Sequence, residues 1–517
     1  VGMAMAEAHL ESVFNKENYP VVDHYTYVLG GDGCMMEGIT SEAFSLAGTL
    51  GLSKLIVLYD SNRISIEGST DIAFRENVQE RMQAFGFQTI TVEDGNDIDA
   101  IGKAIEAAKA DTEHPSFITI KTQIGFGCPA KQGKASAHGE PLGVENVEAL
   151  RKNLNWPSEE PFFVPEEVYK NYSEIAEQKA EVEAAWNVMF AAYCEEYPEM
   201  EALWNRYHNA KAGEALKDDA GFWAKQEKPE ASRAISGRLI NYIKDVLPNL
   251  FGGSADLAPS NKTNMKDAGD FSKEDRAGRN LHFGVRELAM AAIGNGIMLH
   301  GGLRAYVSTF FVFSDYCKPM ARLSALMGVP LTYVFTHDSI GVGEDGPTHE
   351  PIEQMAALRA MPNFHVFRPC DATETEAAWY SAVTSEHTPT ALVLTRQNLE
   401  PMAGSSREAL KGGYIIDDCE GTPELILIAS GSEVALAVHA KETLEQSEEY
   451  KESVLPREVR RRVAVEALGS FGWDKYTGLD GKIIAMESFG ASAPAGLLFK
   501  KFGFTVEHVV EVAKSLK

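Results

Sequence analysis

The sequence predicts an α/β protein of three domains, with mainly parallel sheets flanked by helices. Two apolar segments, residues 25–29 and 55–59, flank a helix-like segment at residues 35–50. A glycine-rich turn, GGDG at residues 30–33, joins the first apolar segment to that helix. Strand, glycine turn, helix and strand together form one βαβ unit of a parallel sheet. The same alternation recurs twice later in the 517-residue chain, which is long enough for about three separate cores.

The first domain is expected at residues 1–212 and begins with an amphipathic helix pattern at residues 1–14. From about residue 157 the pattern becomes helical and charged, which predicts a long helical linker. Between these segments, further elements are expected at residues 89–92 (strand), 98–110 (helix) and 117–121 (strand).

The second domain is expected at residues 213–402 and a smaller third domain at residues 403–517. In the second domain, strands are expected at residues 250–252, 305–308, 331–336, 365–368 and 391–395. In the third domain, strands are expected at residues 425–429 and 483–487, with a helix at residues 433–444.

Composition and charge narrow the class of protein. Hydrophobic residues make up 44% of the chain and charged residues 24%, as in ordinary globular proteins. A net charge of −27 argues against nucleic acid or an anionic membrane as partner, because both select basic surfaces. We expect neither a membrane span nor a leader segment, since no apolar run has the length or flanks of either. The six cysteines are scattered without a CxxC pair, which is typical of reduced thiols in a cytosolic protein.

Asp32 and Asn62 are the first candidate binding residues. Each follows a strand of the predicted βαβ unit, and a right-handed crossover places both at the carboxyl edge of the sheet, where open α/β sheets bind ligands. Glycines such as Gly33 let the backbone approach a phosphate, and the next helix offers unpaired N–H groups. Carboxylate and amide oxygens suit Mg²⁺ or Ca²⁺ that phosphates also hold. The hypothesis is a metal-bridged diphosphate site; the alternative is that GGDG is only a tight turn and Asn62 a turn residue.

Two features of the second domain are candidate site elements that also have ordinary structural explanations. Glu287 lies in the first turn of a helix predicted to continue through residues 288–299, where a carboxylate often only stabilises the helix dipole. Phe310, Phe313 and Tyr316 are spaced by three residues and are expected on one helical face, where aromatic residues usually form core.

The strongest local signal is THDSIGVGEDGPTHEP, residues 336–351, which follows an apolar strand and therefore lies at a carboxyl edge. It formally contains GxGxxG, but no helix opens there, and we reject a dinucleotide site. His337, Asp345 and His349 in a rigid Gly/Pro loop suit proton handling and hydroxyl recognition. One alternative is that both are ordinary loop histidines whose hydrogen bonds are satisfied within the protein. Another is a metal site, although no HxxxH or HxH spacing supports it.

Two arginines and a serine extend this signal. Arg396 ends the next strand in the same manner as His337, and Arg233 and Ser236 are expected just before a helix. Each arginine alone is usually a salt-bridge residue, but a convergent set of Arg, His and Ser is what a sugar phosphate requires.

In their joint order, these segments resemble the transketolase family through most of the chain. The motifs are GDGCMMEG within residues 30–38, DSNRISIEG (60–68), KTQIGFGCP (121–129), SAHG (136–139), RAISG (233–237), GGSADLAPSN (252–261), HFGVRE (282–287), residues 309–316, residues 336–351 and LTRQNL (394–399). Members are thiamine diphosphate enzymes that work as homodimers with each active site at the subunit interface. The resemblance implies a thiamine diphosphate-binding fold present twice, plus a smaller C-terminal α/β domain.

The resemblance also implies roles for individual residues. The divalent metal, Mg²⁺ or Ca²⁺, would be held by Asp32, Asn62 and the carbonyl of Ile64. The cofactor would contact Gly33, Asp32, Asn62, His138, Asp256, Glu287, Phe310, Phe313 and Tyr316. Sugar phosphates would contact Arg233, Ser236, His337, Asp345, His349 and Arg396. Catalysis would involve Glu287 at the pyrimidine N1′, His349 in proton transfers, His138, and Glu37, which would be linked to Glu287 of the partner subunit.

The implied reaction moves a two-carbon ketol unit from a ketose phosphate such as xylulose 5-phosphate to an aldose phosphate such as ribose 5-phosphate, in the cytoplasmic pentose phosphate pathway. One alternative is another thiamine diphosphate enzyme, such as a deoxyxylulose phosphate synthase or a dihydroxyacetone synthase. A second is a non-catalytic or split-enzyme binding subunit. Retention of Asp32, Asn62, Glu287 and Asp345 favours an active enzyme, because a decayed site would lose charged groups that are costly to bury.

The resemblance includes departures. An N-terminal segment usual in the family is expected to be absent from this sequence, and the C-terminal domain is expected to be shortened near residues 446–450. Leu288 stands where a histidine is frequent and Glu350 where a glutamine is frequent. The surroundings of the site are therefore expected to differ from those in relatives.

Overall fold

The computed structural model describes residues 1–209, 211–419, 423, 425–444 and 459–516, so the shortening expected near residues 446–450 lies outside the described residues. They form two compact units, Val1–Asn205 with Ser272–Ala277 and Arg206–Phe271 with Gly278–Lys517. The predicted α/β class with mainly parallel sheets is confirmed. No helix in the described part of the chain has the length and apolar character needed to cross a lipid bilayer.

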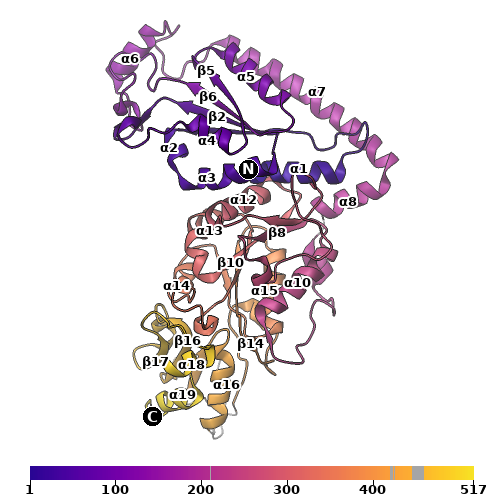
Figure 1. The fold of residues 1–517 in the computed structure, drawn as a ribbon, viewed down its shortest axis with the longest axis vertical. Helices are drawn as coiled ribbons and strands as arrows, with labels where there is room; N and C mark the ends of the chain where they lie inside the picture. Colours follow the sequence, from indigo (N-terminus) through magenta and orange to yellow (C-terminus); the bar gives the residue numbers. More distant parts are fainter. Residues whose placement is uncertain (210, 420–422, 424, 445–458, 517) are drawn as a thin grey trace. The chain divides into compact units, whose positions relative to one another are not determined.

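The first unit is built on a parallel sheet in the order β1-β2-β6-β5 (Figure 1). Its strands are β1 (Thr26–Gly31), β2 (Leu55–Ser61), β5 (Gln88–Val92) and β6 (Ser116–Lys121). The predicted βαβ unit is confirmed, because β1 and β2 pair in parallel with Gly31 opposite Asp60. The helix predicted at residues 35–50 is two helices, α2 (Asp32–Met36) and α3 (Gly38–Leu50), since the backbone is extended at Glu37.

Helices and short elements complete this unit. The helix α5 (Ile98–Ala110) has the predicted bounds and is capped by Asp97, whose side chain accepts the N–H of Ala100. Ala104 and Ala108 of α5 are buried in an aliphatic core with residues of β2, β5 and β6. The other elements are α1 (Gly2–Phe14), β3 (Ile64–Ser65), β4 (Gly68–Ser69), η1 (Thr70–Ile72), α4 (Val78–Ala84), η2 (Ala135–Ala137) and α6 (Val144–Asn153).

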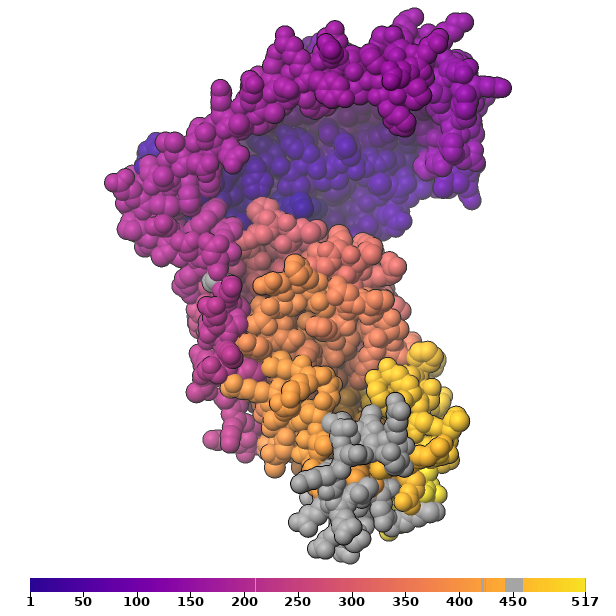
Figure 2. All heavy atoms as spheres, turned by 180° about the vertical axis from the view of Figure 1, so that it is seen from behind, coloured from indigo at the N-terminus to yellow at the C-terminus, as the bar shows by residue number. Residues whose placement is uncertain are grey.

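The predicted helical linker contains α7 (Glu166–Glu196), α8 (Pro198–His208) and α9 (Ala212–Leu216). Tyr193 of α7 donates its hydroxyl to the carbonyl of Phe14 at 2.6 Å, and Trp186 donates its indole N–H to the carbonyl of Val21 at 3.1 Å. Figure 2 shows α7, in magenta, as a ridge along the indigo part of the first unit. The helix therefore packs on the first unit through its aromatic residues.

The second unit contains a six-stranded parallel sheet in the order β12-β13-β11-β10-β8-β9. Its strands are β8 (Leu250–Ser254), β9 (Asn280–His282), β10 (Arg304–Phe310), β11 (Thr332–Thr336), β12 (His365–Phe367) and β13 (Thr390–Leu394). The sequence did not predict the short strand β9 or the antiparallel pair β7 (Glu230–Ala231) and β14 (Asn398–Leu399). Trp379, Tyr306 and Leu392 are fully buried in the core beside this sheet.

The helices of this part are α10 (Ser232–Val246), α11 (Ala258–Asn261), α12 (Glu287–His300), η3 (Phe311–Phe313), α13 (Ser314–Met327), η4 (Ile340–Val342), α14 (Gln354–Arg359), α15 (Ala372–Thr384) and η5 (Arg407–Lys411).

A three-stranded parallel sheet, the C-terminal sheet, lies near the end of the chain in the order β15-β16-β17. Its strands are β15 (Ile426–Ala429), β16 (Arg462–Gly469) and β17 (Lys482–Met486). The central strand β16 was not predicted, because Glu466 interrupts its apolar run. The helices are α16 (Glu433–Leu444), α17 (Asp474–Thr477), α18 (Ala495–Lys501) and α19 (Val506–Lys514).

Candidate active site

In the first unit, Asp32 is a buried carboxylate at the carboxyl edge of the sheet, only 4% exposed. One carboxylate oxygen accepts the Tyr59 hydroxyl at 2.6 Å and the other accepts the Arg63 backbone N–H at 2.9 Å. Burial, together with the hydrogen bond to Asp32, raises the pKa of Tyr59, so its hydroxyl stays a donor. Among the ion pairs of the described residues, none includes Asp32. A buried carboxylate without a cationic side chain fits a bound metal ion.

Asn62 lies directly beyond β2, and its side-chain oxygen accepts the N–H of Ile64 at 3.0 Å. This bond turns the chain after the strand and holds Asn62 and Ile64 together. No cluster of three or more His, Cys, Asp or Glu residues suited to a metal occurs in the described ranges. The oxygen donors predicted for a metal are therefore one carboxylate, one amide and one carbonyl, a set that suits a hard cation also held by phosphates.

Three further predicted residues of this unit are exposed. Gly33 lies in α2 with open space where a Cβ would stand, so its backbone is accessible. Glu37 lies at the junction of α2 and α3, and His138 follows η2. No hydrogen bond joins His138 to Asp32.

In the second unit, Glu287 is the first residue of α12, as predicted. The expectation that Phe310, Phe313 and Tyr316 share one helical face is wrong. Phe310 ends the strand β10 with an extended backbone, Phe313 lies in η3, and Tyr316 lies in the first turn of α13. The rings nevertheless form a row: the centroids of Phe310 and Phe313 are 6.1 Å apart with nearly parallel planes, and those of Phe313 and Tyr316 are also 6.1 Å apart.

His337 lies against this aromatic row. Its backbone has a positive φ of 64°, its side chain is buried, and its ring centroid is 3.7 Å from that of Phe310. The Nδ1 atom of the ring is hydrogen-bonded to the Thr336 hydroxyl at 2.8 Å. The Nε2 atom is 3.3 Å from a guanidinium nitrogen of Arg233. Burial first, and then the charges of Arg233, Arg396 and His349, lower the pKa of His337 to about 3. His337 is therefore neutral among positive neighbours.

The arginines of this group are held from different elements. Arg233 and Ser236 lie within α10, Arg233 in its first turn, not before the helix as predicted. Burial, together with the charge of Arg396, lowers the pKa of Arg233. Arg396, two residues beyond β13, donates to the Val342 carbonyl at 2.7 Å and lies 3.5 Å from the exposed carboxylate of Glu344. We call Arg233, His337 and Arg396 the cationic group. Its positive charge suits a phosphate.

Other predicted residues are placed around this group or away from it. The His349 ring lies 5.5 Å from that of Phe313, and its Nδ1 is 2.8 Å from the Thr348 hydroxyl. Asp345 and Asp256 are exposed, the latter with a positive φ of 62°. Ser236 is fully buried and accepts the indole N–H of Trp379 at 2.8 Å, so its hydroxyl is engaged in the core.

The sequence did not single out Asn261, which supports the strand end beneath His337. Asn261 is fully buried; its side-chain oxygen accepts the Thr336 hydroxyl at 2.7 Å, and its amide donates to Ser308 at 2.9 Å. A buried amide must be fully hydrogen-bonded, so it fixes three elements together. The sequence feature that could have pointed to Asn261 is its position at the end of the motif GGSADLAPSN. Its hydrogen-bond partners are visible only in the structure.

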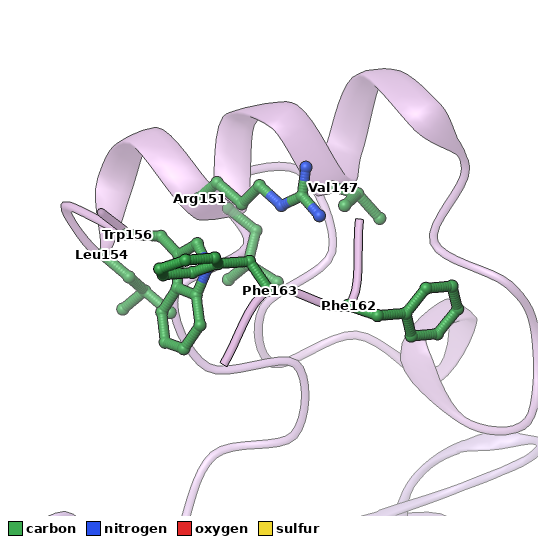
Figure 3. Close-up of a pocket in the computed structure, with 7 residues that line it drawn as sticks. Val147, Arg151, Leu154, Trp156, Phe162 and Phe163 are labelled. Atoms are coloured by element: carbon green, nitrogen blue, oxygen red, sulfur yellow. The ribbon is translucent and has the colours of Figure 1, made fainter. Parts of the chain in front are cut away.

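A shallow apolar cavity of about 250 Å³ lies beneath α6 in the first unit (Figure 3). Figure 3 shows the rings of Trp156 and Phe163 close together, with the Phe162 ring pointing away. The cavity is lined by Val147, Leu150, Arg151, Leu154, Trp156, Phe162 and Phe163. It contains none of the predicted site residues and no acid–base pair.

Comparisons with known proteins agree with these arrangements. Family models match in three consecutive parts: "Transketolase, thiamine diphosphate binding domain" at residues 1–212, "Transketolase, pyrimidine binding domain" at residues 228–402 and "Transketolase-like TK C-terminal domain" at residues 412–505. The transketolase of Halalkalibacterium halodurans is 49% identical over 539 aligned residues, which cover 100% of this chain and 81% of that protein.

Solved structures agree as well. The transketolase from Leishmania mexicana superposes with a TM-score of 0.94 at 42% identity, covering 100% of this chain and 79% of the other. The transketolase from Pichia stipitis in complex with sedoheptulose 7-phosphate superposes with a TM-score of 0.92, also at 42% identity and with the same coverage. By sequence, by fold and by its thiamine diphosphate-binding domains, this chain belongs to the transketolase family.

Proposed function

We propose that this transketolase acts as a glycolaldehyde transferase, moving a two-carbon ketol unit from a ketose phosphate to an aldose phosphate. The observation that carries the proposal is the cationic group beside the aromatic row: Arg233 is 3.3 Å from His337, whose ring packs on Phe310. Such a group suits a sugar phosphate next to a flat cofactor ring. The complex of the Pichia stipitis transketolase with sedoheptulose 7-phosphate supports this substrate class.

Thiamine diphosphate, when bound, supplies the stabilisation of the carbanion that ketol transfer requires. In the first unit, Asp32, Asn62 and the Ile64 carbonyl would hold Mg²⁺ or Ca²⁺, with Gly33 and His138 near the diphosphate. The buried, unpaired charge of Asp32 supports this assignment.

In the second unit, Glu287 would hold a proton at the pyrimidine N1′, and Phe310, Phe313 and Tyr316 would contain the ring. Asp256 would lie at the cofactor. The cationic group would bind the substrate phosphate, Asp345 would accept a substrate hydroxyl, and His349 would move protons at the substrate. Ser236, which is buried against Trp379, would support the helix that carries Arg233 rather than contact the phosphate.

We further propose that the chain acts as a homodimer, with Glu37 linked to Glu287 of the partner subunit. The exposed position of Glu37 supports this, since it leaves the carboxylate available to a second chain. Mixing the Asp32→Ala and Glu287→Ala proteins tests the arrangement. If each site draws on two subunits, mixed dimers regain one intact site and activity reappears; if each subunit is self-sufficient, the mixture stays inactive.

The domains are assigned to residues 1–212, 213–402 and 403–517, and the reaction to the pentose phosphate pathway in the cytoplasm.

The decisive experiment measures ketol transfer from xylulose 5-phosphate to ribose 5-phosphate with thiamine diphosphate and Mg²⁺, with Asp32→Ala as control. Turnover that disappears in the control supports the proposal. Consumption of pyruvate as the donor would instead indicate a deoxyxylulose phosphate synthase. Cofactor binding without turnover of either donor would indicate a non-catalytic subunit.

A further inference from the structure

We propose that Arg368 is a positioning residue through which the C-terminal sheet fixes the loop that binds the substrate phosphate. This inference rests on the proposed function, because it concerns the same cationic group. Its basis is a buried ionic network that joins the two sheets of the second unit and ends one residue from His337.

One side of the Arg368 guanidinium faces the loop that contains His337 and Asp338. Arg368 follows β12, and its side chain is fully buried. Its Nε donates to the carboxylate of Asp338 at 2.8 Å. Asp338 directly follows His337, and its own side chain is also buried, so this ion pair restrains the loop at the position next to the cationic group.

The other side of the guanidinium faces the C-terminal sheet. Its Nη1 donates to the Ser430 carbonyl at 2.9 Å and pairs closely with Glu433. Ser430 follows β15 and Glu433 opens α16, so both lie at the carboxyl edge of the sheet. Open α/β sheets bind ligands at that edge. Here an arginine of the neighbouring sheet occupies it.

The turn between Ser430 and Glu433 is shaped around this arginine. Gly431 has a positive φ of 59°, and its N–H donates to the Arg368 carbonyl at 2.9 Å. A Cβ at Gly431 would lie 2.8 Å from the Arg368 guanidinium carbon, closer than van der Waals contact allows. The turn therefore requires glycine because the guanidinium lies on it.

Opposite charges alternate within the network. Arg368 contacts Asp338 and Glu433 and lies 3.9 Å from Glu466, while Arg359 donates to Glu466 at 2.9 Å. Burial disfavours the charge of Arg368, but Glu433 and Asp338 outweigh it and raise its pKa. Removing Arg368 altogether would leave buried carboxylates uncompensated. The inference is best tested by variants that keep the charge.

The expected consequence concerns the phosphate specifically. His337 is held at a positive φ, a backbone conformation that persists only where its neighbours enforce it. If Asp338 shifts, His337 shifts against Arg233 and Phe310, and the cationic group loses its shape. Binding of a phosphorylated acceptor should weaken, whereas an aldehyde without phosphate should bind as before.

The test compares ribose 5-phosphate with glycolaldehyde as acceptors in the full-length enzyme. Gly431→Ala displaces the guanidinium and removes no charge. The matched control is Gly478→Ala in the same region, since Gly478 also has a positive φ, 69°, but open space where the Cβ would stand. We expect Gly431→Ala to raise KM for ribose 5-phosphate about tenfold, equivalent to about 1.4 kcal/mol, with KM for glycolaldehyde unchanged within about twofold. Gly478→Ala should change neither KM.

A second pair of variants covers the case in which Gly431→Ala does not fold. Arg368→Lys keeps the charge but loses the planar fork that spans Asp338 and Glu433, and it should show the same phosphate-specific rise. Arg359→Lys is its control, because Arg359 binds Glu466 without touching Asp338.

Equal rises for both acceptors, or no rise in folded Gly431→Ala or Arg368→Lys, would overturn the positioning role and leave the proposed function standing. A wild-type enzyme that transfers a ketol unit to neither acceptor would overturn the proposed function itself.

Discussion

Burial of the Glu350 carboxyl predicts how the stability of the protein changes with pH. Glu350 directly follows His349 and is only 2% exposed. Neither of its carboxylate oxygens makes a hydrogen bond of normal geometry within the described residues. A Cβ at Gly490 would overlap one of them, so the carboxyl is packed beneath the backbone that follows β17. Burial raises the pKa of Glu350 from 4.5 to about 7, against a smaller opposing effect of the Ala491 N–H.

The sign of the pH dependence follows from this direction. The native state holds the proton of Glu350 more tightly than the unfolded state does, so its stabilising effect is complete below pH 4.5 and is lost as the pH rises through about 7. Each unit of pKa shift corresponds to about 1.4 kcal/mol, so the shift from 4.5 to about 7 corresponds to roughly 3 kcal/mol in the free energy of unfolding. Because the surrounding structure relaxes around the ionised carboxylate, we expect about half of this, or roughly 1.5 kcal/mol.

The perturbation is Glu350→Gln, which keeps the shape and removes the titration. Relative to wild type, its melting temperature should be nearly unchanged at pH 5 and higher by roughly 4 °C at pH 8.5, at about 2–4 °C per kcal/mol for a domain of this size class. Differential scanning fluorimetry across this range measures the difference. Glu353→Gln, an exposed glutamate three residues on, is the control and should show none. A constant difference between Glu350→Gln and wild type at all pH values would refute the reasoning, because it would show that packing rather than ionisation is responsible.

Three further substitutions test the candidate site. Asp32→Asn removes the buried charge and should raise the Mg²⁺ concentration for half-maximal thiamine diphosphate binding roughly 100-fold, measured by titration; an unchanged midpoint would remove Asp32 from the metal site. Glu287→Gln should lower kcat at least about 100-fold with cofactor affinity retained, as loss of a proton-transfer group requires, and a fall in affinity alone would contradict that role. Arg396→Leu should raise KM for ribose 5-phosphate about tenfold. It should also shift the pKa of His337 up from about 3, since one positive neighbour is gone, and NMR titration of labelled histidine would show no shift if Arg396 does not act on His337.

Much of the fold follows from local signals in the sequence. The glycine turn before Asp32 and the apolar runs around it predict β1, β2 and their parallel pairing, because glycine and apolar periodicity act locally. The strand β16 escaped prediction because Glu466 breaks its apolar run. In the structure Glu466 is buried and paired with Arg359, a residue more than a hundred positions earlier, and no local pattern contains that partner.

The candidate site divides in the same way. Asp32, His337 and Arg396 follow strands, and position at a strand end is readable from sequence. The row of Phe310, Phe313 and Tyr316 was expected on a helix, yet the extended backbone at Phe310 places it across a strand, a turn and a helix. Spacing by three residues suits a helix, but it does not distinguish a helix from this sequence of elements.

The candidate site residues of the first unit and those of the second unit are electrostatic opposites. Asp32 is a buried carboxylate that forms no ion pair within the described part of the chain. Arg233 and Arg396, in contrast, lie beside the buried, neutral His337. Either arrangement is costly for the protein alone, since a buried or clustered charge is stable only with a partner of opposite sign. A cation on Asp32 would supply that partner in the first unit. A phosphate would supply it for Arg233, since Arg396 already lies 3.5 Å from the exposed carboxylate of Glu344. The cationic group also opposes the overall charge of −27, so an anionic substrate is bound by local geometry against the field of the whole molecule.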